Sequence, residues 1–297
     1  MSYIIHGATG AQGLPLLMRL QKAGKSVIAA VRHADALEGI QTVIIDNGSI
    51  DSLVEAYRGA EGIFVHLPQT SETERERYAR NIAKAIAIAR PERVVISTSG
   101  VIVDEPGSPL QAPPESPVMI LIDEVRKTGV SMAVVAPRLY LENLLLPSVY
   151  DGVLSDRVLR YPLRPDLAVS WSSHQDVAVV AEQLLGNRAV TGTVGIGFLP
   201  GLTGSELAAG FANHLSRPVS YESVEPHNFR HLIAPVIGEA AAGSVSSFYQ
   251  KLQGISANTI MPETSAQQLL GLAPCTIEEW LADIADSSSA STQGNPG

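Results

Sequence analysis

The sequence lacks the features that mark several specialised classes of protein. Its single cysteine, Cys275, excludes a disulfide within the chain and fits a reducing compartment. A formal net charge of −9 provides no basic surface for nucleic acid. No run approaches the roughly 20 apolar residues of a membrane span, and glycines stand where a signal peptide would have its cationic and apolar regions. We therefore expect a cytoplasmic protein, monomeric or homodimeric, that binds neither nucleic acid nor membrane.

What is present favours a large packed core. Of the 297 residues, 45% are hydrophobic and 17% charged, which suits one large domain with a smaller appendage. Six short apolar runs in the first half alternate with helical patterns; they are "SYIIHG", "SVIAAVR", "TVIID", "EGIFVHLP", "RVVISTSG" and "VSMAVVAPR". Because these runs are nearly continuous rather than alternating, both faces of their sheet should be covered. The pattern predicts a doubly wound parallel α/β fold.

The regular alternation stops after Arg138. We expect the main domain over residues 1–150, with residues 169–200 returning to its sheet. Residues 151–286 should form a smaller, mainly helical substrate lobe. The segment 287–297, "SSSASTQGNPG", has nothing to bury and is expected to be a disordered tail.

The stretch "YIIHGATGAQG" carries the strongest functional signal. Gly7, Gly10 and Gly13 have the spacing G-x-x-G-x-x-G between an expected strand and an expected helix. Gly7 permits a tight turn, Gly10 leaves space for a pyrophosphate, and Gly13 lets the helix pack closely on the strand. The helix then offers its N-terminal amides to the phosphates. The pattern predicts dinucleotide binding in the first unit of the fold.

The end of the second strand indicates which dinucleotide is bound. NAD-binding folds usually end this strand with an acidic residue that accepts a hydrogen bond from the ribose. Here the strand ends in "AAVRHAD", with Arg32 at that place, His33 beside it and Asp35 beyond. A guanidinium can grip a 2′-phosphate in a bidentate manner. The charge therefore favours NADP(H) over NAD(H).

A series of landmark segments extends to about Asp286: "GATGAQG…VIAAVR", "DNGSIDSLVEAYRGAEGIFVHLP", "VVISTSG", "APRLYLENLL", "HQDVA", "LTGSELAAGFANHLSRPVSYESV" and "TIEEWLAD". Taken together they resemble the NmrA-like branch of the atypical short-chain dehydrogenases/reductases. The resemblance implies a Rossmann-type sheet with a small C-terminal lobe and NADP(H) as cofactor. It also implies either reduction of quinones, enones or aromatic carbonyl compounds, or cofactor sensing without turnover.

The resemblance also implies which residues hold the cofactor. The pyrophosphate would be lined by Gly7, Thr9, Gly10, Ala11, Gln12 and Gly13, and the 2′-phosphate by Arg32 and His33. Asp46 and Asn47 would border the adenine. The path toward the nicotinamide would be followed by His66, Leu67, Pro68, Ser97, Thr98 and Ser99, and residues 137–143, including Asn143, would close over it.

One expected feature is missing. Hydride transfer to a carbonyl builds negative charge on oxygen, which needs a proton donor or another stabilising group. Ordinary short-chain dehydrogenases supply Tyr-x-x-x-Lys, but none of the eight tyrosines here has a lysine four residues later. The lysine found early in the helix after the fifth strand in related reductases is also absent, since Lys127 lies at that helix's end.

Three outcomes remain open. Ser99, Tyr140 or His66 could donate the proton; water could protonate a quinone; or the protein could bind cofactor without catalysis. A non-redox isomerase or cyclase is a further alternative. Trp171 and His174, together with Ser99 and Tyr140, are expected to wall the substrate pocket. No metal site is expected, because His227 and His231 lack a third ligand and read as a pair on a helix surface.

Overall fold

The chain divides into two units. The computed structural model describes residues 2–33, 37 and 39–293, and their side chains as far as Asp286. The first unit comprises Met1–Pro137, His174–Ile196 and Met261–Leu272. The second comprises Arg138–Ser173, Gly197–Ile260 and Ala273–Gly297.

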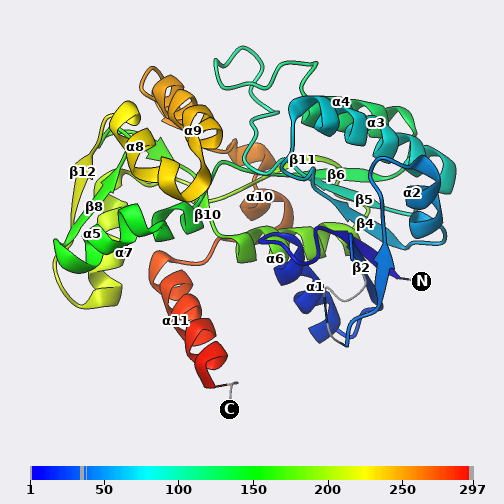
Figure 1. The fold of residues 1–297 in the computed structure, drawn as a ribbon, viewed down its shortest axis with the longest axis horizontal. Helices are drawn as coiled ribbons and strands as arrows, with labels where there is room; N and C mark the ends of the chain where they lie inside the picture. The colour runs from blue at the N-terminus through cyan, green and yellow to red at the C-terminus, as the bar shows by residue number, and fades with distance from the viewer. Residues whose placement is uncertain (1, 34–36, 38, 294–297) are drawn as a thin grey trace. The chain divides into compact units, whose positions relative to one another are not determined.

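A seven-stranded parallel sheet forms the centre of the first unit (Figure 1). Its order is β11-β6-β5-β4-β1-β2-β3, and every neighbouring pair is parallel. The strands are β1 (Tyr3–His6), β2 (Val27–Val31), β3 (Thr42–Ile44), β4 (Gly62–Val65), β5 (Val94–Ser97), β6 (Met132–Pro137) and β11 (Gly192–Ile196). Every residue of β1, β4, β5 and β6 is buried, as the continuous apolar runs predict.

Helices cover both faces of this sheet. On one face α2 (Ile50–Tyr57), α3 (Glu72–Ala89) and α4 (Pro117–Lys127) pack side by side, and on the other α1 (Gly13–Lys22) packs against α6 (His174–Gly186) (Figure 1). The short η3 (Pro262–Thr264) and α10 (Ala266–Leu270) lie against β11. The predicted doubly wound α/β fold is confirmed.

The strand order reverses at β1, which lies between β4 and β2. After β1 the chain continues to β2 on one side of it, whereas after β4 it continues to β5 on the other side. The loops that follow β1 and β4 therefore diverge. In open α/β sheets a ligand binds outside the carboxyl ends of the strands at such a reversal. The topology therefore points to the segments that follow β1, β2 and β4.

The second unit consists of short strands and helices. Three two-stranded parallel sheets pair β7 (Leu139–Tyr140) with β10 (Trp171–Ser172), β8 (Val158–Tyr161) with β12 (Ser220–Ser223), and β9 (Ala168–Val169) with β13 (Ala257–Asn258). The helices are η2 (Leu141–Leu145), α5 (Pro147–Ser155), α7 (Gly204–Leu215), α8 (Pro226–Ile237), α9 (Glu239–Leu252) and α11 (Ile277–Gln293).

An aromatic cluster forms the core of the second unit. The Tyr161 ring meets Trp171, Phe229 and Tyr249 edge to face, with centroids 5.4 to 5.5 Å apart. The hydroxyls of Tyr161 and Tyr249 are hydrogen-bonded to each other, which satisfies two polar groups inside this apolar core. Such packing gives the small unit a core independent of the parallel sheet.

The division differs from the expected boundaries in three places. The first segment of the sheet unit ends at Pro137 rather than near residue 150. The return to the sheet is made by α6 and β11, whereas β9 and β10 pair within the second unit. Helix α11 runs to Gln293, so the start of the expected tail is helical; extending a helix that is already nucleated costs little. Residues 294–297 lie outside the described part of the chain.

Candidate functional site

The turn between β1 and α1 requires its glycines. Gly7 has φ +58°, in the left-handed region, and its carbonyl accepts a hydrogen bond from the amide of Gly10 at 2.8 Å. A Cβ on Gly13 would lie 2.7 Å from the carbonyl oxygen of His6, so only glycine allows α1 to start this close to β1. A Cβ on Gly10 would meet only the Gly7 oxygen, at 3.2 Å. The roles that the spacing predicted for Gly7 and Gly13 agree with this geometry.

The N-terminus of α1 has no side-chain cap. Gln12 occupies the capping position but makes no capping hydrogen bond, and the first turn contains no acidic residue. Thr9 and Ala11, on the turn before it, are exposed. Helix N-termini carry a partial positive charge and free amides, so an uncapped one can bind an anion.

Three buried polar atoms at the same edge of the sheet have no partner among the described residues. They are Oδ1 of Asn47, Nε2 of His66 and Oγ1 of Thr98. Asn47 follows β3, His66 follows β4 and Thr98 follows β5, so all three stand at carboxyl ends of parallel strands. Buried polar groups are nearly always hydrogen-bonded. Three such atoms at one edge could form hydrogen bonds with a polar ligand there.

The segments after β2 and β3 carry charge. Arg32 and His33 directly follow β2 and are exposed, and no ion pair joins Arg32 to another described residue. Asp35 lies outside the described residues. Asp46 is exposed, and its Oδ1 accepts a hydrogen bond from the amide of Gly48 at 2.7 Å, which shapes the turn before α2. A guanidinium with no ion pair to any described residue thus follows β2, where the sequence predicted a phosphate contact.

Histidines gather near this edge. Burial, with a smaller contribution from the neighbouring His66, lowers the pKa of His6 to about 3, and the hydroxyl of Tyr57 is hydrogen-bonded to its Nε2 at 2.8 Å. Burial also lowers the pKa of His66, although a hydrogen bond to the Leu67 backbone opposes this. Burial lowers the pKa of His174, at the start of α6, to about 4. All three rings are therefore neutral at pH 7.

The ring of His66 covers the glycine turn. It packs directly over Gly7, where a Cβ would lie 2.7 Å from its Cε1. Its Nε2 has no hydrogen-bond partner among the described residues. Leu67 is buried and Pro68 half-buried behind it.

A ring of hydrogen bonds joins the glycine turn to the end of β5. Ser97 Oγ donates to Gln12 Oε1 at 2.6 Å, and Gln12 Nε2 donates to Ser99 Oγ at 3.0 Å. The amide of Ser99 donates to Ser97 Oγ at 3.2 Å, which closes the ring. Ser99 has φ +54°, an uncommon conformation for a residue other than glycine. The structure thus brings together three residues that the sequence suggested as separate cofactor contacts.

The remaining predicted residues lie in the second unit. Tyr140 ends β7, and Asn143, in η2, hydrogen-bonds to the hydroxyl of Tyr161. Trp171 is fully buried and packs edge to face on Tyr161. Their roles over the nicotinamide or in a substrate pocket stay predictions.

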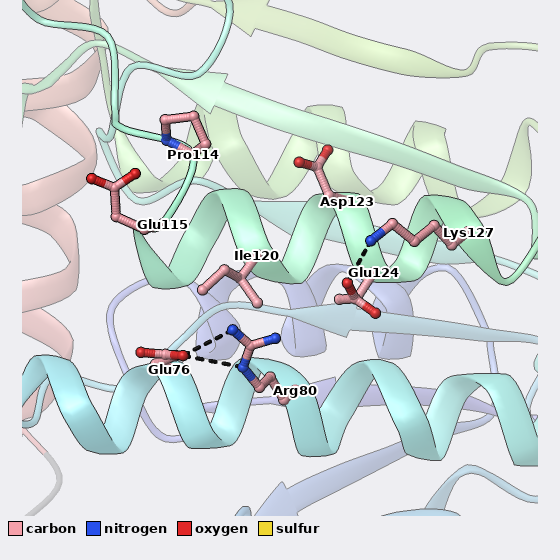
Figure 2. Close-up of a pocket in the computed structure, with 8 residues that line it drawn as sticks. All are labelled: Glu76, Arg80, Pro114, Glu115, Ile120, Asp123, Glu124 and Lys127. Atoms are coloured by element: carbon pink, nitrogen blue, oxygen red, sulfur yellow. Dashed lines mark hydrogen bonds and ion pairs between the residues drawn. The ribbon is translucent and has the colours of Figure 1, made fainter.

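A surface groove between α3 and α4 does not share these properties. Its volume is about 370 Å³. Figure 2 shows two ion pairs among its lining side chains, Arg80 with Glu76 at 2.9 Å and Lys127 with Glu124 at 2.6 Å. Pro114 and Glu115, from the segment just before α4, also line this groove. None of the predicted site residues does.

Two classes of feature are not found in the described part of the chain. Its His, Cys, Asp and Glu side chains form no cluster of three or more that could hold a metal ion. His227 and His231 are both exposed on α8. In addition, none of the described helices is long and apolar enough to cross a membrane.

Sequence reasoning missed the pairing of His6 with Tyr57. Both are buried, and their rings lie 5.6 Å apart beneath the glycine turn. His6 stands within the strand pattern and Tyr57 at the end of a helix, so neither position marks them as partners. Only the close packing of α2 against the sheet shows the pair.

The fold and site define a dinucleotide-binding type of α/β protein, and the comparisons with known proteins narrow this. The model of the NmrA-like family matches residues 3–281, so the chain belongs to the NmrA-like family. A sequence comparison with curated proteins finds no match.

Solved structures share the fold at low identity. The triphenylmethane reductase of a Citrobacter species is 18% identical, with a TM-score of 0.78 over 95% of this chain and 99% of that one. Its complex with NADP(H) is 17% identical with a TM-score of 0.77, over 94% and 98% of the two chains. The NADPH-dependent quinone oxidoreductase of Escherichia coli, in complex with NADPH, is 18% identical with a TM-score of 0.73 over 96% and 99%.

Proposed function

We propose that this protein is an NADP(H)-dependent oxidoreductase that delivers hydride to a quinone, an enone or an aromatic carbonyl compound. The observation that carries the proposal is the set of unpartnered polar atoms on Asn47, His66 and Thr98, at the edge of the sheet where the uncapped α1 begins. A dinucleotide offers phosphate to the helix amides and hydroxyl and amide groups to such atoms. The residues present therefore fit this cofactor.

The choice of NADP(H) rests on Arg32. It follows β2, where NAD-binding folds place a carboxylate, and it is exposed without an ion-pair partner among the described residues. A guanidinium at this place attracts the 2′-phosphate of NADP(H). It gives no advantage to NAD(H), whose free 2′-hydroxyl a carboxylate would bind better. The relatives crystallised with NADP(H) and NADPH support the same assignment.

Reduced nicotinamide, when bound, supplies the hydride, and the chain's own residues must manage the charge that develops on the substrate. His66 is a poor proton donor, because burial lowers its pKa and leaves the ring neutral at pH 7. Ser99 has a hydroxyl for which no acceptor is found among the described residues. We therefore favour Ser99 over His66 as the group that stabilises a substrate oxyanion.

A regulatory protein that binds NADP(H) without turnover is the second candidate. The observation in its favour is the missing Tyr-x-x-x-Lys pair, which removes the usual donor. An isomerase or cyclase on the same scaffold would also bind the cofactor, but without net loss of its absorbance.

One experiment separates these functions. NADPH absorbance is followed while the protein is incubated with menadione, aromatic ketones, enones and a triphenylmethane dye. Steady oxidation that requires both protein and acceptor supports the reductase. Tight NADPH binding with no oxidation by any acceptor supports the sensor, and no binding overturns both.

A further inference from the structure

The hydrogen bonds among Gln12, Ser97 and Ser99 have a definite direction. The amide of Ser99 can only donate, so Ser97 Oγ accepts from it at 3.2 Å. Ser97 then uses its own proton toward Gln12, at 2.6 Å. That distance is typical of O–H···O, whereas the 3.0 Å from Gln12 to Ser99 is typical of N–H···O. Both lengths place the carbonyl oxygen of Gln12 toward Ser97 and its NH₂ group toward Ser99.

This direction leaves one donor uncommitted. Ser99 Oγ accepts from Gln12, and no acceptor for its own proton is found among the described residues. The left-handed backbone of Ser99, at φ +54°, is held by the hydrogen bond that its backbone N–H donates to Ser97 Oγ. Backbone strain retained by surrounding contacts often marks a functional residue. Gln12 is 8% exposed, so water does not compete readily for its amide.

We infer that Gln12 is a positioning residue that keeps the Ser99 hydroxyl a hydrogen-bond donor toward the carbonyl oxygen of the substrate. The inference rests on the proposed reductase function and deepens it. Gln12 belongs to the glycine turn and Ser99 to the segment after β5, so the link joins the cofactor-binding segment to the group that meets the substrate.

Two hydride acceptors, a quinone and a cationic dye, distinguish this positioning role from a purely structural one. A quinone that gains a hydride becomes a hydroquinone monoanion, whose oxygen carries the new charge until water protonates it. A triphenylmethane dye cation that gains a hydride at its central carbon becomes a neutral leuco dye, and no oxygen becomes charged. A hydrogen-bond donor that stabilises an oxyanion therefore assists the reduction of the quinone but not that of the dye.

The test measures the ratio of the menadione rate to the malachite green rate at saturating NADPH. A change in how the protein binds or uses NADPH affects both rates, so it cancels in their ratio. Ser99→Gly removes the hydroxyl and tolerates the left-handed backbone. Gln12→Glu places an acceptor against Ser99, which then spends its proton on the carboxylate. Gln12→Met removes the contact. Gln183→Glu, the same chemical change at an exposed residue of α6, is the control.

We expect the ratio to fall about 10²-fold in Ser99→Gly and Gln12→Glu, about 10-fold in Gln12→Met, and not at all in Gln183→Glu. A second readout needs no turnover: 4-nitrophenolate, an oxyanion, should bind the NADP⁺-saturated protein about 10-fold more weakly in Ser99→Gly and Gln12→Glu.

Other results overturn the inference in distinguishable ways. Equal loss of both rates, or unchanged 4-nitrophenolate affinity, means that the ring is structural only. Reduction of the dye but not of the quinone by the wild type leaves the reductase standing and removes the oxyanion role. Reduction of neither acceptor removes the proposed function as well.

Discussion

The contact between Gly7 and His66 gives a sharp test of the glycine turn. In Gly7→Ala the new methyl group would overlap the His66 ring, whose Cε1 is 2.7 Å from its position. Crowding of this kind costs about 1–3 kcal/mol. The left-handed backbone of Gly7, at φ +58°, adds about 1–2 kcal/mol for any residue with a Cβ. The free energy of unfolding should therefore fall by about 2–5 kcal/mol.

Removing the ring should rescue most of the crowding. In a His66→Ala background the three closest contacts of the Gly7→Ala methyl group, all with the imidazole ring, are removed, so mainly the backbone cost remains. The two changes should therefore couple by about 1–3 kcal/mol. Urea unfolding of the wild type, both single variants and the double variant measures this coupling. If the two effects add within about 0.5 kcal/mol, the ring does not cover Gly7 as described.

Three further predictions concern the cofactor and pH. Arg32→Asp should weaken NADP(H) binding by about 10- to 100-fold and NAD(H) binding much less; equal losses in calorimetry would refute the 2′-phosphate contact. Gly10→Ala should weaken NADPH binding strongly with only a small change in melting temperature, because the new Cβ meets one described protein atom, the Gly7 oxygen at 3.2 Å; retained affinity would contradict the pyrophosphate assignment. The pKa of His6 is lowered from 6.5 to about 3 in the folded protein. Its contribution to stability is therefore present above pH 6.5 and is lost at about 1.4 kcal/mol per unit as the pH falls toward 3. His6→Gln should flatten this part of the curve in urea titrations, and an unchanged slope would show that His6 is not neutral and buried.

The sequence predicted the sheet unit well because its signals are local. Continuous apolar runs predict strands buried on both faces, and Gly7, Gly10 and Gly13 predict a turn whose close contacts the structure then shows. The position of Arg32 after the second strand can likewise be predicted from the sequence, without the tertiary structure.

The second unit could not be predicted in the same way. Strands β7, β9, β10 and β13 are each two residues long, too short to show any periodicity. Residues 261–272 join the sheet unit through a bridge between Gly195 and Ser265, a contact between distant segments. Helix α11 extends into the polar sequence at the start of the expected tail, a continuation that the composition of this segment does not reveal.

The ring of hydrogen bonds among Gln12, Ser97 and Ser99 could not be predicted from the sequence either. Gln12 lies 85 residues from Ser97 and 87 from Ser99, and each had a separate local interpretation. Their hydrogen bonds form only because β1 and β5 end at the same edge of one parallel sheet, with β4 between them. Which atoms donate depends on distances that no residue pattern contains.

The most direct measurement is a calorimetric titration of the protein with NADPH. A dinucleotide held by the β1–α1 turn and Arg32 predicts saturable one-to-one binding, with NADH binding measurably weaker. Absence of heat with every pyridine nucleotide, confirmed by an unchanged melting temperature in their presence, would contradict the account.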